Sequence, residues 1–347
     1  MANRDVLALG TSAGGVEALI SLAKHFRSDF PASVLVTIHL PSHYRSVLDE
    51  VLNGAGSLPT RFAVDGEKLR KGHIYIAPPD RHLLLDGDRL SLGSGPRENN
   101  ARPAIDAMLR SVAVCCGPRG VGVVLTGTLA DGASGLWALH QCGGLTVVQD
   151  PKDAAFPEMP LTAMNRVKPD HVVGLRDMPA LLDSLAHEPA GGPVPVPPGT
   201  RYEVGIARNG HSSMDRMDNM DNMDGLGRRS VLSCPDCGGV MWEIAEGDLL
   251  RYRCHVGHTY TADLMSVMTD ENVRRSLGVA LRALEERTAL ARKLYNQANE
   301  RGDRLLAQNW LSRVHEFERE MTVIRDSIAR VDEIAANFEQ ATKVAAE

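Results

Sequence analysis

Long hydrophobic runs are missing from this sequence, which has no stretch of about 18 uninterrupted apolar residues, the length that a transmembrane helix requires. The N-terminus shows no basic stretch followed by an apolar one, the pattern of a secretory signal. Positive charge is not in excess either, since the formal net charge is -6, and nothing in the composition draws the chain to nucleic acid or to an anionic membrane. We therefore expect a cytoplasmic protein without membrane insertion or nucleic-acid binding.

Cysteine is scarce, with 6 residues in a chain of 347, and the six are of two kinds. Cys115, Cys116 and Cys142 lie in apolar contexts and are expected to be buried, reduced packing residues. The other three cluster with histidines in the C-terminal half, which in a cytosolic chain favours a metal site over disulfides.

The first half of the chain alternates strand-like and helix-like segments. This alternation predicts an α/β fold, a doubly wound domain over residues 1–187 with a mostly parallel, buried sheet. Strands are expected at 6–9, 34–40, 61–64, 73–77, 121–126, 145–149 and 172–175. Helices are expected at 15–26, 45–53, 103–115, 133–142 and 179–186, with a hairpin at 83–92.

The stretch GTSAG at residues 10–14 follows the first strand and fits the G-x-S-x-G pattern of a nucleophile elbow. In such a turn the Ser12 hydroxyl is exposed beyond the strand, close to backbone N–H groups that can hold an oxyanion. A simple helix N-cap is the alternative role for this serine. Phosphate-binding loops fit less well, because Ser12 stands where a dinucleotide loop needs glycine, and Val16 and Glu17 stand where a P-loop needs lysine and a hydroxyl residue.

Two more reactive side chains follow predicted strands. His39 ends the second strand, and Asp131 comes shortly after the strand at 121–126. Catalytic groups in α/β sheets gather beyond the carboxyl ends of the strands, so Ser12, His39 and Asp131 meet the requirements of a hydrolytic triad. The alternatives are a structural histidine, an aspartate that only caps a turn, and Asp150 as a competing acid at another strand end.

Several motifs in this half follow one another in a fixed order. They are LGTSAGGVEAL (9–19), IHLP (38–41), GHIYIAPPD (72–80), RPAID (102–106), VLTGTLADGASGL (124–136) and MP (159–160). Together they resemble the catalytic domain of the chemotaxis protein-glutamate methylesterases, the CheB family, over residues 1–187. The resemblance implies that Ser12 is the nucleophile, His39 its base and Asp131 the acid that orients His39.

The resemblance also implies an activity, the hydrolysis of glutamate γ-methyl esters on the cytoplasmic helices of chemoreceptors, without a catalytic cofactor. Backbone N–H groups of Ala13 and Thr128 are the expected oxyanion donors. A threonine is usual in the family where Ala13 stands, and a methionine where Thr128 stands. A glutamine deamidase side activity stays open, and the alternative function is a catalytically weak adaptor that recruits signalling partners.

Usual members of the family carry an N-terminal receiver domain that controls access to the site. Here the first strand begins at residue 6, so the expectation is a catalytic domain without its own receiver. Such an enzyme is either regulated by another signalling protein or constitutively open.

Residues 188–230 differ in composition from the first half. A Pro/Gly-rich stretch at 190–199 and a Met-Asp repeat of period three, starting at Met214, predict a flexible linker. Evenly spaced methionines can bind copper, but this repeat lacks histidine or cysteine partners.

Residues 231–265 contain a second possible chemical site. Cys234 and Cys237 form a C-x-x-C knuckle, and Cys254 with His258 forms the second half of a zinc-ribbon-like module. His258 is preferred to His255, because adjacent ligands at 254 and 255 would strain the knuckle. Four protein ligands leave no open position, so we expect a structural Zn²⁺ that staples a module too small for its own core.

The remaining residues, 269–345, have helical periodicity. Two apolar stripes, with Leu290 on the first and Leu305 on the second, are separated by a break at 301–303 and predict an α-helical hairpin. So thin a hairpin is expected to pack on the ribbon or on a partner, and docking on the helical bundle of a receptor is a hypothesis from shape.

Overall fold

The computed structural model describes residues 2–39, 46–209 and 223–346. It divides into two compact units, Met1–Leu264 and Met265–Glu347, which are described separately. None of the described helices is long and apolar enough to cross a membrane.

A seven-stranded sheet lies at the centre of the first unit, with strand order β3-β4-β2-β1-β7-β8-β9 and every pairing parallel. Strand order changes direction between β1 and β7, the position at which α/β sheets bind ligands. The strands are β1 (Val6–Thr11), β2 (Ser33–Ile38), β3 (Thr60–Phe62), β4 (Ile74–Ile76), β7 (Gly120–Val124), β8 (Leu145–Gln149) and β9 (His171–Val173).

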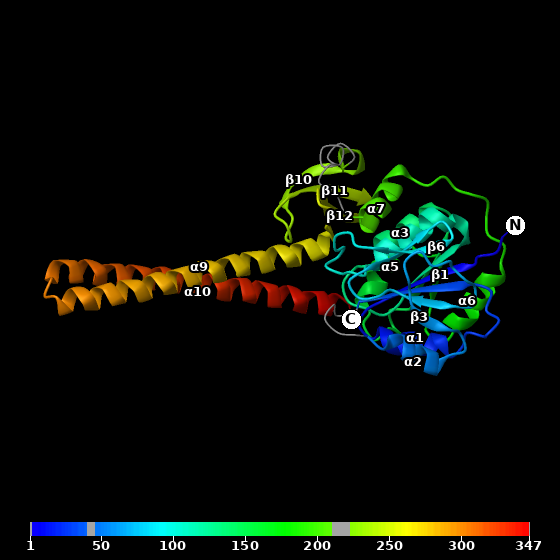
Figure 1. Cartoon of the computed structure of the whole chain (residues 1–347), viewed down its shortest axis with the longest axis horizontal. Helices are drawn as coiled ribbons and strands as arrows, with labels where there is room; N and C mark the ends of the chain where they lie inside the picture. The colour runs from blue at the N-terminus through cyan, green and yellow to red at the C-terminus, as the bar shows by residue number, and fades with distance from the viewer. Residues whose placement is uncertain (1, 40–45, 210–222, 347) are drawn as a thin grey trace. The chain divides into compact units, whose positions relative to one another are not determined.

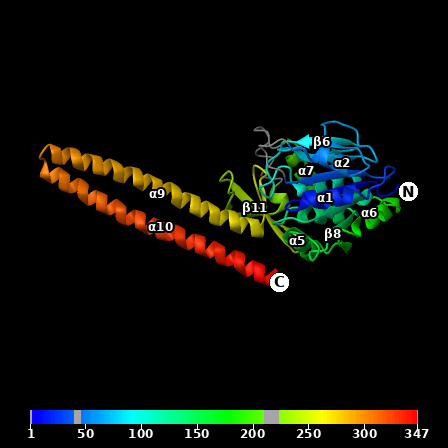
Figure 2. The same cartoon turned by 90° about the horizontal axis from the view of Figure 1, so that it is seen from below.

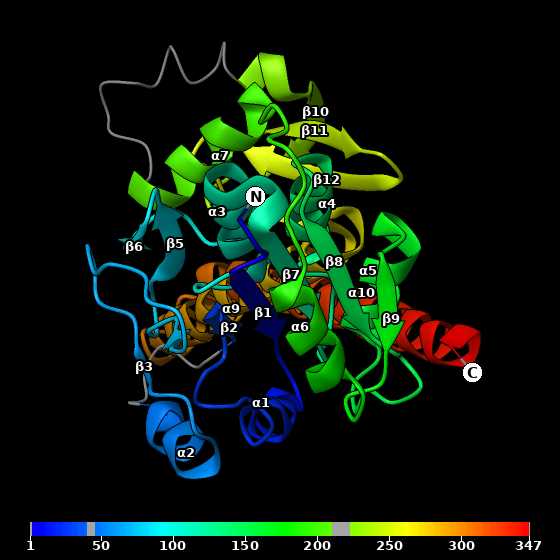
Figure 3. The ribbon, with the colours of Figure 1, turned by 90° about the vertical axis from the view of Figure 1, so that its right-hand side faces the viewer.

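Helices cover both faces of this sheet, as the alternating pattern predicts (Figure 3). One face carries α1 (Gly15–Ala23), α2 (Leu48–Ala55) and α6 (Met178–His187). The other carries α3 (Ile105–Cys116), extended by the short 3-10 helix Gly117–Arg119, α4 (Ala133–Gln141) and α5 (Glu158–Val167). The doubly wound fold is confirmed, and α5 is a helix that the sequence pattern missed.

The predicted linker is wrong for residues 198–209, because they form a packed helix, α7 (Pro198–Asn209). Its Ala207 packs with Leu84 and Ala104 and approaches the backbone of β6 (Arg89–Gly93) at Gly93. Strand β6 pairs with β5 (His82–Asp86) as predicted. A Cβ at Gly93 would lie 2.2 Å from the Ala207 carbonyl oxygen, so this contact requires glycine. Residues 210–222, with Met214, Met217 and Met220 of the repeat, lie outside the described residues.

A four-stranded antiparallel sheet stands where the ribbon-like module was predicted. Its order is β10-β11-β12-β13, and it belongs to the same compact unit as the parallel sheet. The strands are β10 (Arg228–Ser233), β11 (Val240–Glu246), β12 (Leu249–Cys254) and β13 (Thr259–Thr261). We call this sheet and its connecting turns, residues 228–261, the C-terminal module.

A pair of long helices confirms the predicted hairpin, although both begin earlier or extend further than the apolar pattern indicates. Helices α9 (Ala262–Glu300) and α10 (Arg304–Ala346) run side by side in Figures 1 and 2. Their seam contains Leu284, Ala291, Val314, Phe317 and Met321. Leu290 and Leu305, which were predicted to lie on the apolar stripes, are instead 58% and 75% exposed.

Candidate active site

Ser12 and His39 lie directly after the neighbouring parallel strands β1 and β2. The Ser12 N–H donates to the Thr126 carbonyl oxygen (3.1 Å), and the His39 N–H donates to that of Thr11 (3.4 Å). Gly14, with φ of 71°, supplies the left-handed turn that lets α1 begin at once. The strand–turn–helix geometry expected of a nucleophile elbow is therefore present at Ser12.

Three of the predicted side chains are in hydrogen-bond contact. The Ser12 Oγ lies 3.1 Å from the His39 Nδ1, and the His39 Nε2 lies 2.8 Å from the Asp131 Oδ2. An ionised carboxylate only accepts, so Asp131 fixes the proton on Nε2 and leaves Nδ1 free to accept the Ser12 hydroxyl proton. Asp150, the competing acid, instead accepts the Lys152 N–H within its own turn.

The Asp131 carboxylate is buried and surrounded by N–H donors. Its Oδ2 accepts from His39 and from the Ile105 backbone (2.7 Å), and its Oδ1 accepts from Asn99 Nδ2 and the Asp106 backbone (both 3.1 Å). Burial favours the neutral acid, but the His39 contact and these N–H groups outweigh it and lower the pKa of Asp131. Asp131 is thus held ionised beside His39.

A second buried carboxylate, Asp106, lies next to Asp131. It accepts from the backbone N–H groups of Gly132 (3.0 Å) and Gly135 (2.7 Å) and from Asn99 Nδ2 (2.9 Å). Burial and the charge of Asp131 raise the pKa of Asp106 to about 8. Asp106 belongs to one of the quoted sequence motifs, but nothing local in that motif indicates its contact with the Asp131 loop.

The loop after β7 passes close to the nucleophile. A Cβ at Gly127 would lie 2.9 Å from the Ser12 Cβ, so only glycine lets this loop approach. Within the described ranges, the N–H groups of Ala13 and Thr128 have no acceptor, whereas those of Gly127 and Leu129 are bonded to Phe156 and Glu158. Unbonded N–H groups at these two positions are what an oxyanion site requires.

A cleft of about 390 Å³ opens beside His39 and Asp131. Two arginines, Arg97 and Arg102, line it, and Arg102 is also paired with Asp80 (2.7 Å). Leu129 lines the cleft as well, and its φ of 66° is a left-handed conformation that is costly for a side chain larger than hydrogen. The cleft therefore leaves His39 open to a molecule that binds there.

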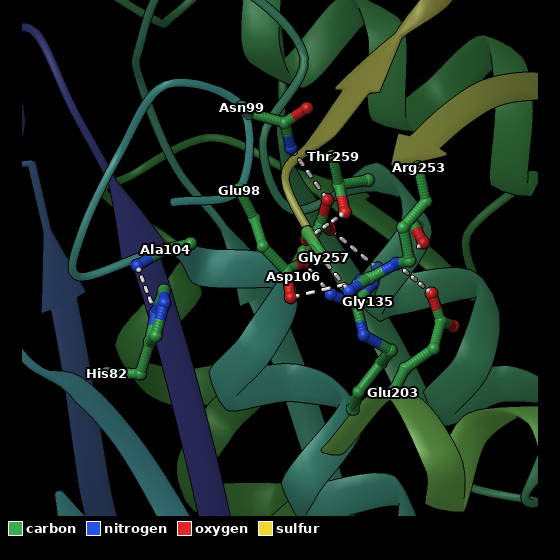
Figure 4. Close-up of polar contacts among 12 residues, drawn as sticks. His82, Glu98, Asn99, Ala104, Asp106, Gly135, Glu203, Arg253, Gly257 and Thr259 are labelled. Atoms are coloured by element: carbon green, nitrogen blue, oxygen red, sulfur yellow. Dashed lines mark hydrogen bonds and ion pairs between the residues drawn. The ribbon is translucent and has the colours of Figure 1, made fainter. Parts of the chain in front are cut away.

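His82 is a buried histidine that the sequence pattern did not single out as functional. Its Nε2 donates to the Pro96 carbonyl oxygen (3.0 Å), and its Nδ1 accepts the Ala104 N–H (3.2 Å), as Figure 4 shows for Ala104. Burial lowers the pKa of His82, which keeps the ring neutral. The ring thereby ties together the two ends of the 96–104 loop that carries Asn99.

A candidate metal centre lies in the C-terminal module. The ligand atoms of the four predicted residues lie within 4.8 Å of one another: Cys234, Cys237, Cys254 and His258. The Sγ atoms of Cys237 and Cys254 are 3.7 Å apart, close to the about 3.8 Å edge of a tetrahedron with Zn–S bonds of about 2.3 Å. The donor set and its spacing therefore fit a closed tetrahedral site, and His255 is not part of the group.

The remaining cysteines are free and lie outside that group, as predicted. Cys116 and Cys142 are buried, and Cys115 is partly buried. Burial raises the pKa of the Cys116 thiol to about 12, so this thiol is unreactive at neutral pH.

Comparison with known proteins places the first half of the chain among methylesterases. A protein-glutamate methylesterase/protein-glutamine glutaminase from Xanthomonas euvesicatoria is 39% identical over 174 residues, 49% of this chain and 48% of that protein. One from Geobacter metallireducens is 35% identical over 189 residues, 54% of each chain. This chain therefore spans about half the length of the curated relatives it matches.

A solved structure gives the same result for the fold. The CheB methylesterase catalytic domain of Thermotoga maritima matches with a TM-score of 0.51 and 28% identity, over 53% of this chain and 100% of that domain. The family model described as CheB methylesterase matches residues 7–182. Because this match runs from β1 through β9 and includes both strand ends that carry Ser12 and His39, the chain belongs to the CheB methylesterase family.

Proposed function

We propose that this protein is a protein-glutamate methylesterase, a carboxylic ester hydrolase that converts glutamate γ-methyl esters on chemoreceptor helices to glutamate and methanol. The observation that carries the proposal is the continuous Ser12–His39–Asp131 contact, at 3.1 Å and 2.8 Å, beside an open cleft. Family membership supplies the substrate class, since relatives are named for this reaction.

The acylation step follows from the hydrogen bonds. The His39 Nδ1 takes the hydroxyl proton of Ser12 while the Oγ attacks the ester carbonyl carbon. The bond to the methoxy oxygen then breaks, and the proton on Nδ1 passes to that oxygen, so methanol leaves and an acyl-enzyme remains. Asp131 stabilises the imidazolium that exists between these two transfers.

Deacylation repeats the same transfers with water. A water molecule gives a proton to the His39 Nδ1 and attacks the acyl carbon, and the Ser12 Oγ leaves with that proton. The N–H groups of Ala13 and Thr128 hold the oxyanion of both tetrahedral intermediates in this proposal. Neither donor depends on its side chain, so the departures from the family pattern at these two positions leave the oxyanion site in place.

A glutamine deamidase activity uses the same machinery. Ammonia replaces methanol as the leaving group, and the acyl-enzyme is identical. The relatives' name includes protein-glutamine glutaminase, which favours this second activity.

Zinc in the C-terminal module and a cytoplasmic location belong to the same proposal. Three thiolates and one imidazole in tetrahedral spacing favour Zn²⁺. The ion has a structural role in this proposal, because four protein ligands leave no coordination position for water or a substrate. None of the six cysteines forms a disulfide, which is typical of a reducing compartment. Methylated receptor helices, and a signalling protein that regulates the enzyme, are the proposed partners.

Methanol release from methylated receptor fragments tests the function. We expect release by the wild-type chain and by Ser28→Ala, which changes an exposed serine outside the Ser12–His39–Asp131 group, and background release by Ser12→Ala. Release by the Ser12→Ala variant at the wild-type rate would remove the nucleophile assignment. No release by the folded wild-type chain would favour the alternative, a catalytically weak adaptor.

A further inference from the structure

The last strand of the C-terminal module pairs with a loop of the active site. The Thr259 N–H donates to the Arg97 carbonyl oxygen (3.4 Å), and the Asn99 N–H donates to that of Thr259 (2.7 Å). Glu98 and Thr259 form a parallel bridge between the two segments. One edge of β13 is therefore hydrogen-bonded to the 96–104 loop, which lines the cleft.

The side chain of Asn99, which Figure 4 draws, extends this contact to the buried carboxylates of Asp106 and Asp131. Its Oδ1 accepts the Thr261 N–H of β13 (3.3 Å), while its Nδ2 donates to Asp106 (2.9 Å) and to Asp131 (3.1 Å). Asn99 is buried, and its backbone φ is 50°, a left-handed conformation that asparagine tolerates better than most residues. A single side chain thus joins the C-terminal module to both buried carboxylates.

A buried ion network fixes the module to the catalytic sheet's helices. Arg253 of β12 pairs with Glu98 (3.1 Å) and Glu203 (2.9 Å), as Figure 4 shows for the Arg253 and Glu203 side chains. Glu98 also pairs with Arg110 of α3. The network contains three arginines and three glutamates, so its charges balance: Arg110, Arg251, Arg253, Glu98, Glu203 and Glu246.

The candidate metal ligands lie at the turn that leads into β13. Cys254 ends β12, His258 directly precedes Thr259, and the Cys254 N–H donates to the His258 carbonyl oxygen (2.9 Å). Within the same turn the Gly257 carbonyl oxygen accepts from Arg253 (3.1 Å). A metal that joins Cys254 and His258 to Cys234 and Cys237 therefore sets where β13 begins.

We propose that metal binding in the C-terminal module positions Asn99, and through it Asp131, so that the module completes the esterase active site. Asn99 is a positioning residue, since it touches the catalytic acid and not the reacting atoms. The metal has a regulatory effect on catalysis without entering the chemistry. This inference rests on the proposed function for its activity readout only, because the coupling itself is visible in backbone hydrogen exchange.

Metal removal from the full chain is the first test, with a chelator followed by reloading with Zn²⁺. We expect one bound metal per chain, and after removal we expect faster hydrogen exchange at the amides of Asn99, Thr261 and Ile105. We also expect kcat for methanol release to fall by about 100-fold, with KM nearly unchanged, as a displaced catalytic group predicts. Reloading with Zn²⁺ restores both readouts.

A matched pair of cysteine variants separates the metal from general thiol effects. Cys237→Ser removes the most exposed candidate ligand and should reproduce the metal-free state, whereas Cys115→Ser should behave as wild type. Absence of bound metal in the wild-type chain, or equal exchange and equal kcat with and without metal, would overturn the proposal.

Asn99→Gly tests the positioning residue in a metal-loaded, folded chain, because glycine keeps the left-handed backbone and removes the amide. We expect lower kcat, little change in KM, and an acid limb of the kcat profile at higher pH, since Asp131 loses an N–H donor. Lys168→Gly, which changes another left-handed residue (φ of 51°) at an exposed helix end, is the control. Wild-type kcat and pH profile in Asn99→Gly would contradict the role of Asn99.

The two proposals fail differently. A metal-loaded wild-type chain that releases no methanol contradicts the proposed function. Metal-independent exchange at Asn99 and Thr261 contradicts the coupling, whatever the activity is.

Discussion

At Asp131, four N–H groups point at one carboxylate, two at each of its oxygens. An amide in this place would present its own NH₂ to at least one of these donors. When this NH₂ takes the place of Oδ2, it no longer accepts from the His39 Nε2–H, and the imidazole is held in the wrong tautomer. The residue is therefore specified as an anion by its surroundings as well as by its chemistry.

Asp131→Asn should lower kcat by about 10⁴-fold, the cost of the same change in a serine protease triad. KM should change little, because Asp131 acts through His39. Steady-state methanol release measures both constants. Asp150→Asn, at another strand end, should keep wild-type kcat, and an equal loss in the two variants would contradict the assignment of the acid.

The residues that meet in the two candidate sites were predictable from the sequence where the evidence is local. Ser12 lies in a short strand–turn–helix pattern, His39 and Asp131 follow strands, and the candidate metal ligands are paired within a few residues, Cys234 with Cys237 and Cys254 with His258. Asn99 and His82 were not predicted, because their partners come from segments that are distant in sequence. Nothing near Asn99 in the chain indicates that Thr261 will lie beside it.

Among the elements, α7 shows best where a sequence pattern fails. Proline and glycine at its start favour an extended linker, and Glu203 is a charge where a buried face needs an apolar residue. The charge is buried only because Arg251 and Arg253 of β12 pair with it, at 2.6 Å and 2.9 Å. Burial of paired ions has no periodic pattern in a sequence, so the helix and its docking depend on a contact that only the fold reveals.

Glu203→Gln should lower the free energy of unfolding by about 3–5 kcal/mol, because it leaves Arg251 and Arg253 buried with too few carboxylates. Chemical denaturation at neutral pH measures this change. Glu243→Gln, which affects a pair with the exposed Arg228, is the matched control and should cost about 1 kcal/mol or less. Similar losses in the two variants would contradict a cooperative buried network.

The same network predicts the direction of acid destabilisation. Burial opposes ionisation of Glu203 and Glu98, but the arginine charges around them outweigh it and lower both pKa values. A lowered pKa in the folded state gives stability that is present above the unfolded value of 4.5 and is lost as pH falls below it. At pH values below about 4.5, the free energy of unfolding of the wild-type chain should therefore decrease more steeply with falling pH than that of Glu203→Gln.

At the scale of the whole molecule, the candidate active site and the candidate metal centre lie in one compact unit, and nearly all of the helical hairpin lies in the other. The Ser12–His39–Asp131 contact, the cleft and the candidate metal ligands all lie in Met1–Leu264, whereas most of α9 and all of α10 lie in the second unit. The hairpin was predictable because its apolar residues recur at helical spacing over many turns. The residues that form its apolar seam were harder to predict, because Leu290 is exposed and Ala291 lies in the seam instead.

Removal of residues 273–347 should leave methanol release from a short glutamyl methyl ester peptide within twofold of wild type. Release from intact methylated receptor bundles should fall, since we expect the hairpin to dock there. The ratio of the two rates is the measurement. Equal rates on receptor bundles with and without the hairpin would contradict a docking role.

The central claim is that Ser12 is a nucleophile activated by His39. Active-site labelling with a fluorophosphonate ester tests this claim most directly. We predict that one equivalent of label per chain is incorporated and that peptide mass spectrometry locates it at Ser12. Methanol release should fall in proportion to the labelled fraction of the chains. The metal-loaded Ser12→Ala chain should take up no label. Methanol release that persists after complete labelling of Ser12, or a label at another residue that abolishes release, would contradict the account.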